Sequence, residues 1–523
     1  MKRIIATLVL GALAFSAGAQ GWQDALSYSE SDYLGTARSV GMGNAMTAVG
    51  GDLGSLTFNP AGSAVAGYSQ FTITPGLSIS SVFGQGTYLD GAPFGFEDGV
   101  KTRAARVQMP NFGAMMVYNT RNRSGLKRVT FGLVGNMTKD YNNKLRATGT
   151  NDQTSLAGSL ASQADGYSVY TLNGGYYESG IPSWETMVGY KGGLFDPVTG
   201  RDGAYVGLTE RLLDNGDIQL ADRIGQYYGL TRRGSKYDLL MNFGLDFNDR
   251  FYVGANIGIT TLDYRYDEVR SEDALSGGNY PSGFESLRIR SAYQDEGSGI
   301  YAKIGFIARP FDGLRIGAAI QTPTLFEIRE NYGLEARSVT RTDEMHDATP
   351  EDVWYYGLKT PFRFNAGLAY TFGKVAMLSA DYEMCDYSGM EFRNSYDDYN
   401  TDFSGSNRDI KDFAGASHIL RVGGELKPSP EMAIRVGYNY ATSPEIGVEA
   451  SRQSVSFGLG YSSAGSFFAD FAVRFQYLPD EFITPYYYWG WDAQGSYITD
   501  VATPEICSQS SLCNALVTLG WRF

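Results

Sequence analysis

The side chains of this chain that could bind another molecule are mainly arginines and carboxylates. Arg363, Arg421 and Arg435 fall on the same faces of their alternating segments as acidic residues such as Glu383 and Glu425. A guanidinium group holds a carboxylate through paired, charge-assisted hydrogen bonds. These three arginines are therefore candidates for binding the carboxylate of a ligand. The alternative is a ladder of ion pairs between neighbouring segments.

Cysteine and histidine are too few to build a metal centre. The chain has three cysteines and two histidines, without a Cys-x-x-Cys pair or a Cys/His cluster, so we expect no metal and no cofactor. Cys507 and Cys513 lie in a Ser-rich stretch that we interpret as a loop, and they could close a small disulfide in an oxidising compartment. His418 has no serine at adjacent strand positions, and His346 lies in a charged stretch. An enzyme such as a phospholipase, which needs a nucleophile beside a base, is therefore not expected.

Residues 1–19 have the pattern of a signal peptide. Lys2 and Arg3 precede an apolar stretch, 4–15, and Ala17-Gly18-Ala19 supplies an A-x-A cleavage signal. No later apolar run is long enough for a membrane-spanning helix. An exported chain of this kind is either soluble or crosses a membrane as a β-barrel, because only closed barrels and helices satisfy their backbone groups in lipid.

Composition favours β structure and argues against a nucleic-acid partner. Aromatic residues make up 14% of the 523 residues, and there are 65 glycines, which suits strands joined by turns. The formal net charge of −14 gives no general attraction to nucleic acid. A mean hydropathy of −0.24 fits a soluble protein, but it also fits a barrel whose strands alternate apolar and polar residues.

The elements that must position the arginines are β-strands. In the last segment, Val517, Leu519, Trp521 and Phe523 share one face, while polar and small residues share the other, which is typical of the closing strand of a membrane barrel. Fourteen segments with this alternation predict a closed antiparallel barrel with an even number of strands. They are 68–82, 103–118, 127–138, 236–246, 251–264, 299–309, 313–323, 361–371, 374–384, 417–427, 432–442, 452–462, 467–478 and 513–523.

The connections between these segments separate into two kinds. Those after even-numbered segments are short, whereas most of those after odd-numbered segments are longer. This predicts short periplasmic turns at one end and long extracellular loops at the other. In the longest loop, 139–235, leucine and isoleucine recur at near-helical spacing over 208–230, which predicts two short amphipathic helices. They would either cap the rim or form an apolar landing surface for a ligand.

Residues 20–66 precede the first strand and lack its alternation. Ala37, Gly41, Ala45 and Ala48 form a small-residue stripe on a predicted helix that Gly50 would end. The stretch 59–61, Asn59-Pro60-Ala61, forces a non-helical turn. A fourteen-stranded barrel is too wide to be filled by its own wall side chains. We therefore expect 20–66 to plug a barrel formed by 67–523, with Asn59, Pro60 and Ala61 as the hatch or gate.

This N-terminal stretch resembles the FadL-type outer-membrane transporters for long-chain fatty acids and other hydrophobic compounds. The resemblance rests on Gly41-x-Gly43-x-Ala45, Asp52 and the sequence Asn-Pro-Ala-Gly at 59–62, together with the signal peptide, the strand number and the terminal Phe523. It implies an all-β, fourteen-stranded barrel in the bacterial outer membrane, with an N-terminal hatch and an internal ligand site.

The same resemblance implies a lateral opening beside a kinked third strand, here 127–138, in which Gly132 and Gly135 are the candidate kink. The expected function is passive, hatch-gated uptake of a hydrophobic small molecule such as a fatty acid. The expected partners are outer-membrane lipid and that ligand, and the chain is expected to act as a monomer. The arginines Arg363, Arg421 and Arg435 would then hold the carboxylate of a fatty acid.

Two other functions suit the same strand pattern. One is an adhesin or structural barrel whose Tyr-rich extracellular loops bind a partner. The other is a water-filled porin, against which the predicted hatch argues. Uptake, cell-surface binding and bilayer conductance would distinguish the three.

Overall fold

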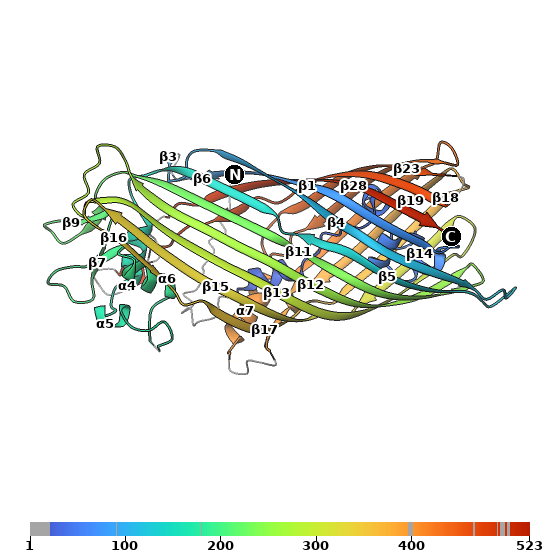
Figure 1. Cartoon of the computed structure of the whole chain (residues 1–523), viewed down its shortest axis with the longest axis horizontal. Coiled ribbons are helices and arrows are strands. Elements are labelled where there is room, and N and C mark those ends of the chain that lie inside the picture. The colour runs from blue at the N-terminus through green and yellow to red at the C-terminus, as the bar shows by residue number, and fades with distance from the viewer. Residues whose placement is uncertain are drawn as a thin grey trace.

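The protein forms one long β-barrel, with short helices inside it and at one end (Figure 1). The computed structural model describes residues 21–523 except 90–91, 179, 396–400, 464–465, 489, 492–496 and 499–502. The predicted signal peptide, 1–19, lies outside the described residues.

Fourteen antiparallel wall positions close the barrel, which confirms the predicted fold class. Each strand pairs with its sequence neighbours, and β1 pairs with both β4 and β28, which closes the ring. The positions are β1 (Gln70–Gly86), β4 (Val100–Asn119), β5 (Leu126–Asp140) with β6 (Asn143–Asn151), β11 (Ile224–Phe247), β12 (Phe251–Ala274), β13 (Phe284–Ala308), β14 (Leu314–Gln321) with β15 (Leu325–Thr340), β17 (Asp352–Lys359) with β18 (Arg363–Phe372), β19 (Ala376–Asp386) with β20 (Glu391–Asn394), β21 (Ala416–Leu426), β22 (Met432–Thr442), β23 (Ser451–Ser462), β24 (Phe467–Tyr477) with β25 (Glu481–Ile483), and β28 (Ile506–Arg522).

The wall is taller than the alternation predicted. Strands β11, β12 and β13 have 24, 24 and 25 residues, and the β11–β12 ladder runs unbroken from Phe247↔Phe251 to Ile224↔Ala274. The extra residues all lie toward the long-loop end. Alternation disappears there because both faces of the strands carry polar side chains, as in the run Asp267-Glu268.

The long-loop end carries the helices α4 (Leu156–Ala164), α5 (Val169–Leu172) and α6 (Trp184–Lys191), seen at the left of Figure 1. Leu160, Met187 and Phe195 bury against the outer parts of β12, β13 and β15. The predicted helices at 208–230 were wrong. That stretch forms the hairpin β9 (Glu210–Leu212) and β10 (Ile218–Leu220), turned at Gly216 with φ +94, and then enters β11.

Smaller elements complete this end of the chain. Three hairpins, a 3-10 turn and a further helix are added to the wall, together with a short strand beside β15. They are β2 (Tyr88–Leu89) with β3 (Ala92–Pro93), β7 (Phe195–Pro197) with β8 (Tyr205–Gly207), β26 (Gly490–Trp491) with β27 (Tyr497–Ile498), β16 (Glu344–Ala348), the 3-10 turn η2 (Tyr387–Gly389) and α7 (Ser404–Phe413).

The outer face of the short-turn half is an apolar belt. Its exposed side chains include Phe112, Met116, Phe131, Leu133, Leu239, Met241, Phe243, Ile257, Ile259, Ile300, Ile304, Leu368, Leu378, Leu420, Val422, Val436, Phe457, Phe471 and Val517. Such a continuous exposed apolar surface needs lipid around it. No helix of the described residues is long and apolar enough to span a membrane.

The N-terminal segment lies inside the barrel, as the blue helices within the wall show (Figure 1). It contains α1 (Trp22–Ser29), α2 (Ala37–Gly41), the 3-10 helix η1 (Leu53–Thr57) and α3 (Gly62–Val65). Helix α2 contacts β22, β23, β24 and β28, whereas α3 contacts β5, β11 and β12 on the other side of the lumen. We call residues 21–66 the plug.

Small residues let the plug backbone touch the wall. A Cβ at Gly437 would lie 2.0 Å from the backbone nitrogen of Gly43, whose φ is +62. The predicted helix through Ala48 is wrong beyond Gly41, because Gly43 and Asn44 both take positive φ and end it. The stripe therefore serves close backbone contact and not a longer helix.

The predicted disulfide between Cys507 and Cys513 is also wrong. Both cysteines are free thiols and lie on the single strand β28, not in a loop. Six residues along one strand separate their Cα atoms by about 20 Å, far beyond the roughly 7 Å limit for a disulfide.

Candidate functional site

The barrel wall is interrupted between β4 and β5. Their ladder begins at Asn119↔Arg128 and ends at Asn111↔Asn136, although β4 continues outward along β1 to Val100. Over the same height β5 and β6 stay paired with β11. No ladder between described residues joins 100–110 of β4 to β5 or β6. We call this interruption the wall gap.

The predicted kink glycines lie just below the wall gap. Gly135 faces the ring of Phe112, and a Cβ there would lie 2.4 Å from Phe112 Cζ. A Cβ at Gly132 would make only ordinary van der Waals contacts. Gly132 is paired with β4 on one side and with β11 on the other. A register shift in the β5–β11 ladder skips Thr138, three residues beyond Gly135. Gly135 thus permits the close packing at the end of the ladder, and the bulge at Thr138 bends the strand.

A cleft of about 570 Å³ lies at the wall gap. Its lining comes from β4, the β5–β6 junction, β11 and β12. The residues are Arg103, Ala104, Ala105, Arg106, Asn142, Asn143, Lys144, Thr231, Arg232, Arg233, Gly234, Asp263 and Arg265. Sequence reasoning did not find this basic lining, because its members are brought together only by the strand register.

The plug covers the inner side of the wall gap. The amide of Leu34 donates to the carbonyl of Met137 at 2.8 Å, and the amide of Asp32 donates to the carbonyl of Thr138 at 2.6 Å. Residues 32–34 therefore pair with the edge of β5 that β4 leaves free. The carboxylate of Asp32 is held in turn by Arg474 at 2.8 Å.

The predicted hatch residues lie elsewhere and are tightly fixed. Asn59 Nδ2 donates to the carbonyls of Thr47 at 2.8 Å and Phe306 at 2.9 Å, and Asn59 Oδ1 accepts from the amide of Ala61. A Cβ at Gly254 would lie 2.4 Å from the backbone of Pro60. These contacts anchor Asn59, Pro60 and Ala61 on β12 and β13, and their role as a hatch stays a prediction.

The three candidate arginines are all buried and ion-paired. Arg363 Nη1 and Arg421 Nη2 share Glu383, at 2.9 and 2.6 Å. Arg435 joins Glu425 at 2.7 Å and Asp470 at 2.5 Å. The ladder of wall ion pairs, stated above as the alternative, therefore describes most of their contacts.

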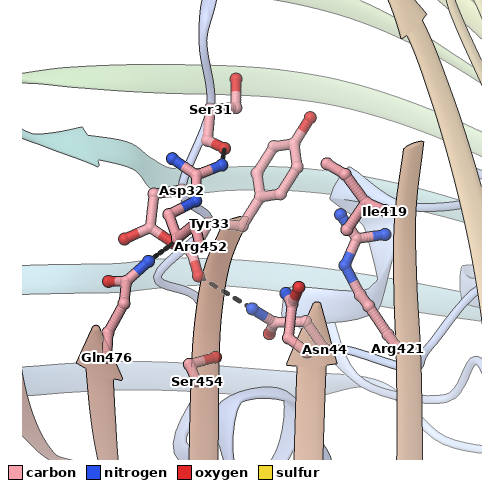
Figure 2. Close-up of a pocket in the computed structure, with 10 residues that line it drawn as sticks. Ser31, Asp32, Tyr33, Asn44, Ile419, Arg421, Arg452, Ser454 and Gln476 are labelled. Atoms are coloured by element: carbon pink, nitrogen blue, oxygen red, sulfur yellow. Dashed lines mark hydrogen bonds between the residues drawn. The ribbon is translucent and has the colours of Figure 1, made fainter. Parts of the chain in front are cut away.

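Arg421 differs from the other two because its guanidinium group is only partly used. Its Nε and Nη1 atoms have no hydrogen-bond partner among the described residues. The group lies 5.1 Å from the ring centre of Phe58 and 5.9 Å from that of Tyr33. It borders a polar pocket of about 10 Å³, the space of one water molecule (Figure 2).

This pocket joins the plug to the wall on the side of β21–β24. Figure 2 shows Tyr33 at its centre, with Asp32, Arg452 and Gln476 on one side and Arg421 on the other. Gln476 Nε2 donates to Asp32 at 3.3 Å, and Asn44 donates to the carbonyl of Tyr33 at 2.9 Å. The polar lining suits water or the oxygens of a ligand head, not an apolar chain.

An apolar chamber lies farther out in the lumen and is filled by α1. Trp22 stacks on Phe413 at 5.6 Å, Leu26 is buried, and Tyr28 donates to Asp295. The wall of the chamber contributes Tyr141, Leu262, Tyr264, Phe326, Ile328, Tyr356, Leu358, Met390 and Phe392. The alternation predicted a polar lumen, so these inward aromatic residues were missed. An apolar ligand could occupy this chamber only after α1 has moved.

The described residues contain no group of three or more His, Cys, Asp or Glu side chains that could hold a metal ion. His418 lies on the outer face of β21, where its Nδ1 is 2.7 Å from the hydroxyl of Tyr382. The site is thus a wall gap, a plug edge and an apolar chamber.

Comparison with known proteins gives matches of structure. No protein-family model and no curated protein matches the sequence. A FadL homologue of Pseudomonas aeruginosa aligns with 94% of this chain and 99% of its own, at 13% identity and a TM-score of 0.51. The toluene transporter TodX of Pseudomonas putida aligns with 94% of this chain and 98% of its own, at 12% identity and a TM-score of 0.46.

The likeness to the FadL homologue extends over nearly the whole of both chains. The fourteen-stranded wall, the internal N-terminal segment and the exposed apolar belt have been described above. The chain is accordingly an outer-membrane β-barrel with the fold of the FadL-type transporters, as its sequence resemblance predicted.

Proposed function

We propose that this barrel is a passive channel that takes up hydrophobic molecules, such as long-chain fatty acids, through a gate formed by its plug. The observation that carries the proposal is the wall gap, at whose inner edge 32–34 pair with β5 and Glu30 of the plug forms an ion pair with Lys139 of β5. The two backbone hydrogen bonds contribute about 1 kcal/mol each net, and opening the gate must also break the ion pairs of Asp32 with Arg474 and of Glu30 with Lys139.

The path runs from the long-loop end to the membrane. A ligand enters above the apolar chamber, displaces α1 from Tyr264 and Phe392, and leaves sideways when 32–34 separate from Met137 and Thr138. Diffusion down a concentration gradient supplies the drive. The unpartnered Nε and Nη1 of Arg421 are charged donors that a ligand carboxylate would bind only after the plug has moved, because the pocket beside them holds about one water molecule.

The gate can be locked by a disulfide between 34 and 137. Leu34 and Met137 are bridge partners, and cross-strand partners have Cα separations of about 4.5–5.5 Å, within the range of a disulfide. In a C507S/C513S background, oxidised Leu34→Cys/Met137→Cys protein should reduce uptake of labelled oleate to the level of empty vector. Reductant should restore uptake. The host is a strain without its own fatty-acid transporter.

A second disulfide on the anchored side of the plug is the matched control. Ser63 Oγ and Thr130 Oγ1 are 2.8 Å apart, so Ser63→Cys/Thr130→Cys fastens α3 to β5 away from the gap. This variant should transport oleate normally in both redox states. Unchanged uptake by the oxidised 34–137 variant would contradict the gate. Equal uptake by unmodified protein and empty vector would exclude fatty acids, and a neutral aromatic hydrocarbon is then the next probe.

A binding function of the outer loops is the second candidate. Tyr170 is 85% exposed and Tyr177 is 64% exposed, both on the loop that carries α5. Exposed tyrosines supply contact area at low entropic cost in protein interfaces. Adhesion of whole cells that is lost in Tyr170→Ser/Tyr177→Ser, with no uptake of any hydrophobic probe, would favour this function.

A further inference from the structure

The cleft at the wall gap is rich in cationic side chains. Five of its lining side chains are cations, Arg103, Arg106, Lys144, Arg233 and Arg265, in addition to Arg232, which is paired with Glu481. The only acid in the lining is Asp263, 3.6 Å from Arg265 Nε. This excess of positive charge is local, because the whole chain has a net charge of −14.

Most of these cations have no counter-ion among the residues that the structure describes. Arg103, Lys144 and Arg233 form no ion pair with any described residue, and Arg106 Nη1 donates only to the carbonyl of Gly234 at 3.2 Å. Arg233 and Arg265 are direct cross-strand partners in the β11–β12 ladder. Like charges in this position destabilise a sheet, and an anion between them would remove the repulsion.

The cleft lies at the height of lipid headgroups. On the outer face of β12 the apolar belt ends at Ile259, followed by Thr261, and Arg265 lies four residues farther out. In a strand tilted by about 40°, four residues rise about 10 Å, which is beyond the hydrocarbon edge and within the headgroup layer. On β4, Arg103 is likewise four residues beyond Val107, which is 77% exposed on the belt.

We propose that the cleft binds the phosphorylated headgroup of an outer-leaflet glycolipid, with the acyl chains lying along the apolar belt below the wall gap. A phosphate group suits the cleft because it carries nearly two negative charges and three acceptor oxygens, which match several arginines at once. A single carboxylate would leave most of the cations unpaired. The bound lipid then lies across the outer mouth of the wall gap.

The test is binding of purified, refolded full-length protein to lipid A with and without its phosphates, measured by native mass spectrometry in detergent. Wild-type protein should bind the phosphorylated form at least tenfold more tightly than the dephosphorylated form. Each headgroup cation contributes about fivefold to affinity, so R103Q/R233Q/R265Q should weaken binding of the phosphorylated form by tenfold to a hundredfold. Raising the salt concentration should weaken it in wild type.

The matched control is R290Q/R329Q/R337Q, which removes three arginines of β13 and β15 that are paired with Asp267, Glu296 and Glu344. It should change lipid A binding less than twofold. Circular dichroism and heat-dependent gel mobility verify that both variants are folded. Equal binding by wild type and R103Q/R233Q/R265Q, or by both forms of lipid A, would overturn the proposal. Oleate binding that is as tight and equally lost in R103Q/R233Q/R265Q would assign the cleft to the transported acid instead.

Discussion

Glu383 lies at the centre of the buried charge network, and replacing it tests whether that network supports the barrel. Its carboxylate is 1% exposed and accepts from Arg363 at 2.9 Å, Arg421 at 2.6 Å and Asn365 Nδ2 at 3.0 Å. Glu383→Ala removes the acceptor of all three donors and leaves two buried guanidinium groups without their anion. Removing one partner of a buried ion pair costs about 3–5 kcal/mol. We therefore expect the free energy of unfolding to fall by about 4 kcal/mol.

Glu383→Gln separates charge from shape. The glutamine side chain keeps one acceptor oxygen, but its NH₂ group faces the donors of the arginines. The retained hydrogen bond to a charged group contributes about 1.5–3 kcal/mol. Its destabilisation should therefore be about half that of Glu383→Ala. Glu431→Ala, at an exposed turn, is the control and should change stability by less than about 0.5 kcal/mol.

The assay is urea unfolding in lipid vesicles, followed by tryptophan fluorescence and by the mobility of unheated protein on gels. A loss below about 1 kcal/mol in Glu383→Ala would refute the reasoning, since it would mean that water or neighbouring carboxylates neutralise the arginines at no cost. A loss in Glu431→Ala as large as in Glu383→Ala would also refute it.

Three further predictions concern the plug, the thiols and the outer loop. Gly437→Ala should lower the thermal unfolding temperature by several degrees, because a Cβ at 437 would lie 2.0 Å from the backbone of Gly43. Gly424→Ala is the control and should leave the unfolding temperature unchanged, because the atom nearest to a Cβ at 424 is a side-chain carbon 3.4 Å away. Alkylation of denatured, unreduced protein should modify Cys507 and Cys513 in addition to Cys385. Modification of only one of the three cysteines would show that the other two form a disulfide. Burial raises the pKa of Asp165 to about 6, although the hydrogen bond that its carboxylate accepts from the amide of Tyr205 lowers the pKa. The folded loop therefore favours the protonated carboxyl, and it should become less stable as the pH rises from 4 to 6. Hydrogen exchange of α4 measures this, and the trend should be smaller in Asp165→Asn.

The strand number could be predicted from sequence, because every wall strand crosses lipid. Lipid outside and a polar lumen inside impose period-two alternation, as in 513–523, and a strand overlaps each of the fourteen predicted segments. The upper parts of β11 and β12 were missed because charged side chains occur on both of their faces there, including buried ones such as Glu272 on the inner face. Arg232-Arg233 and Asp267-Glu268 carry charge on both sides and leave no alternation to detect.

The site depends on pairing between distant residues, which one sequence does not reveal. Two such pairings define the site: the β4–β5 ladder ends at Asn111↔Asn136, and Leu34 pairs with Met137. Both depend on contacts between residues far apart in the sequence. The expectation of an opening beside 127–138 came from the family resemblance, and Gly135 lies near the end of the ladder because glycine in a strand permits close approach. The role of Asn59 was harder to predict, since the same amide that suits a flexible turn also serves as an anchor once Thr47 and Phe306 present carbonyls.

The height of the wall determines where a solute first meets the protein. Strands β11 to β13, of 24 or 25 residues, rise about 60 Å along the barrel axis at the usual tilt, whereas the hydrocarbon layer occupies about 25 Å. The rim that carries α4 and α6 therefore stands about 30 Å above the lipid. If the proposed uptake holds, a hydrophobic solute captured at this rim would travel down inside the protein wall, and would reach the membrane without crossing the polar layer outside it.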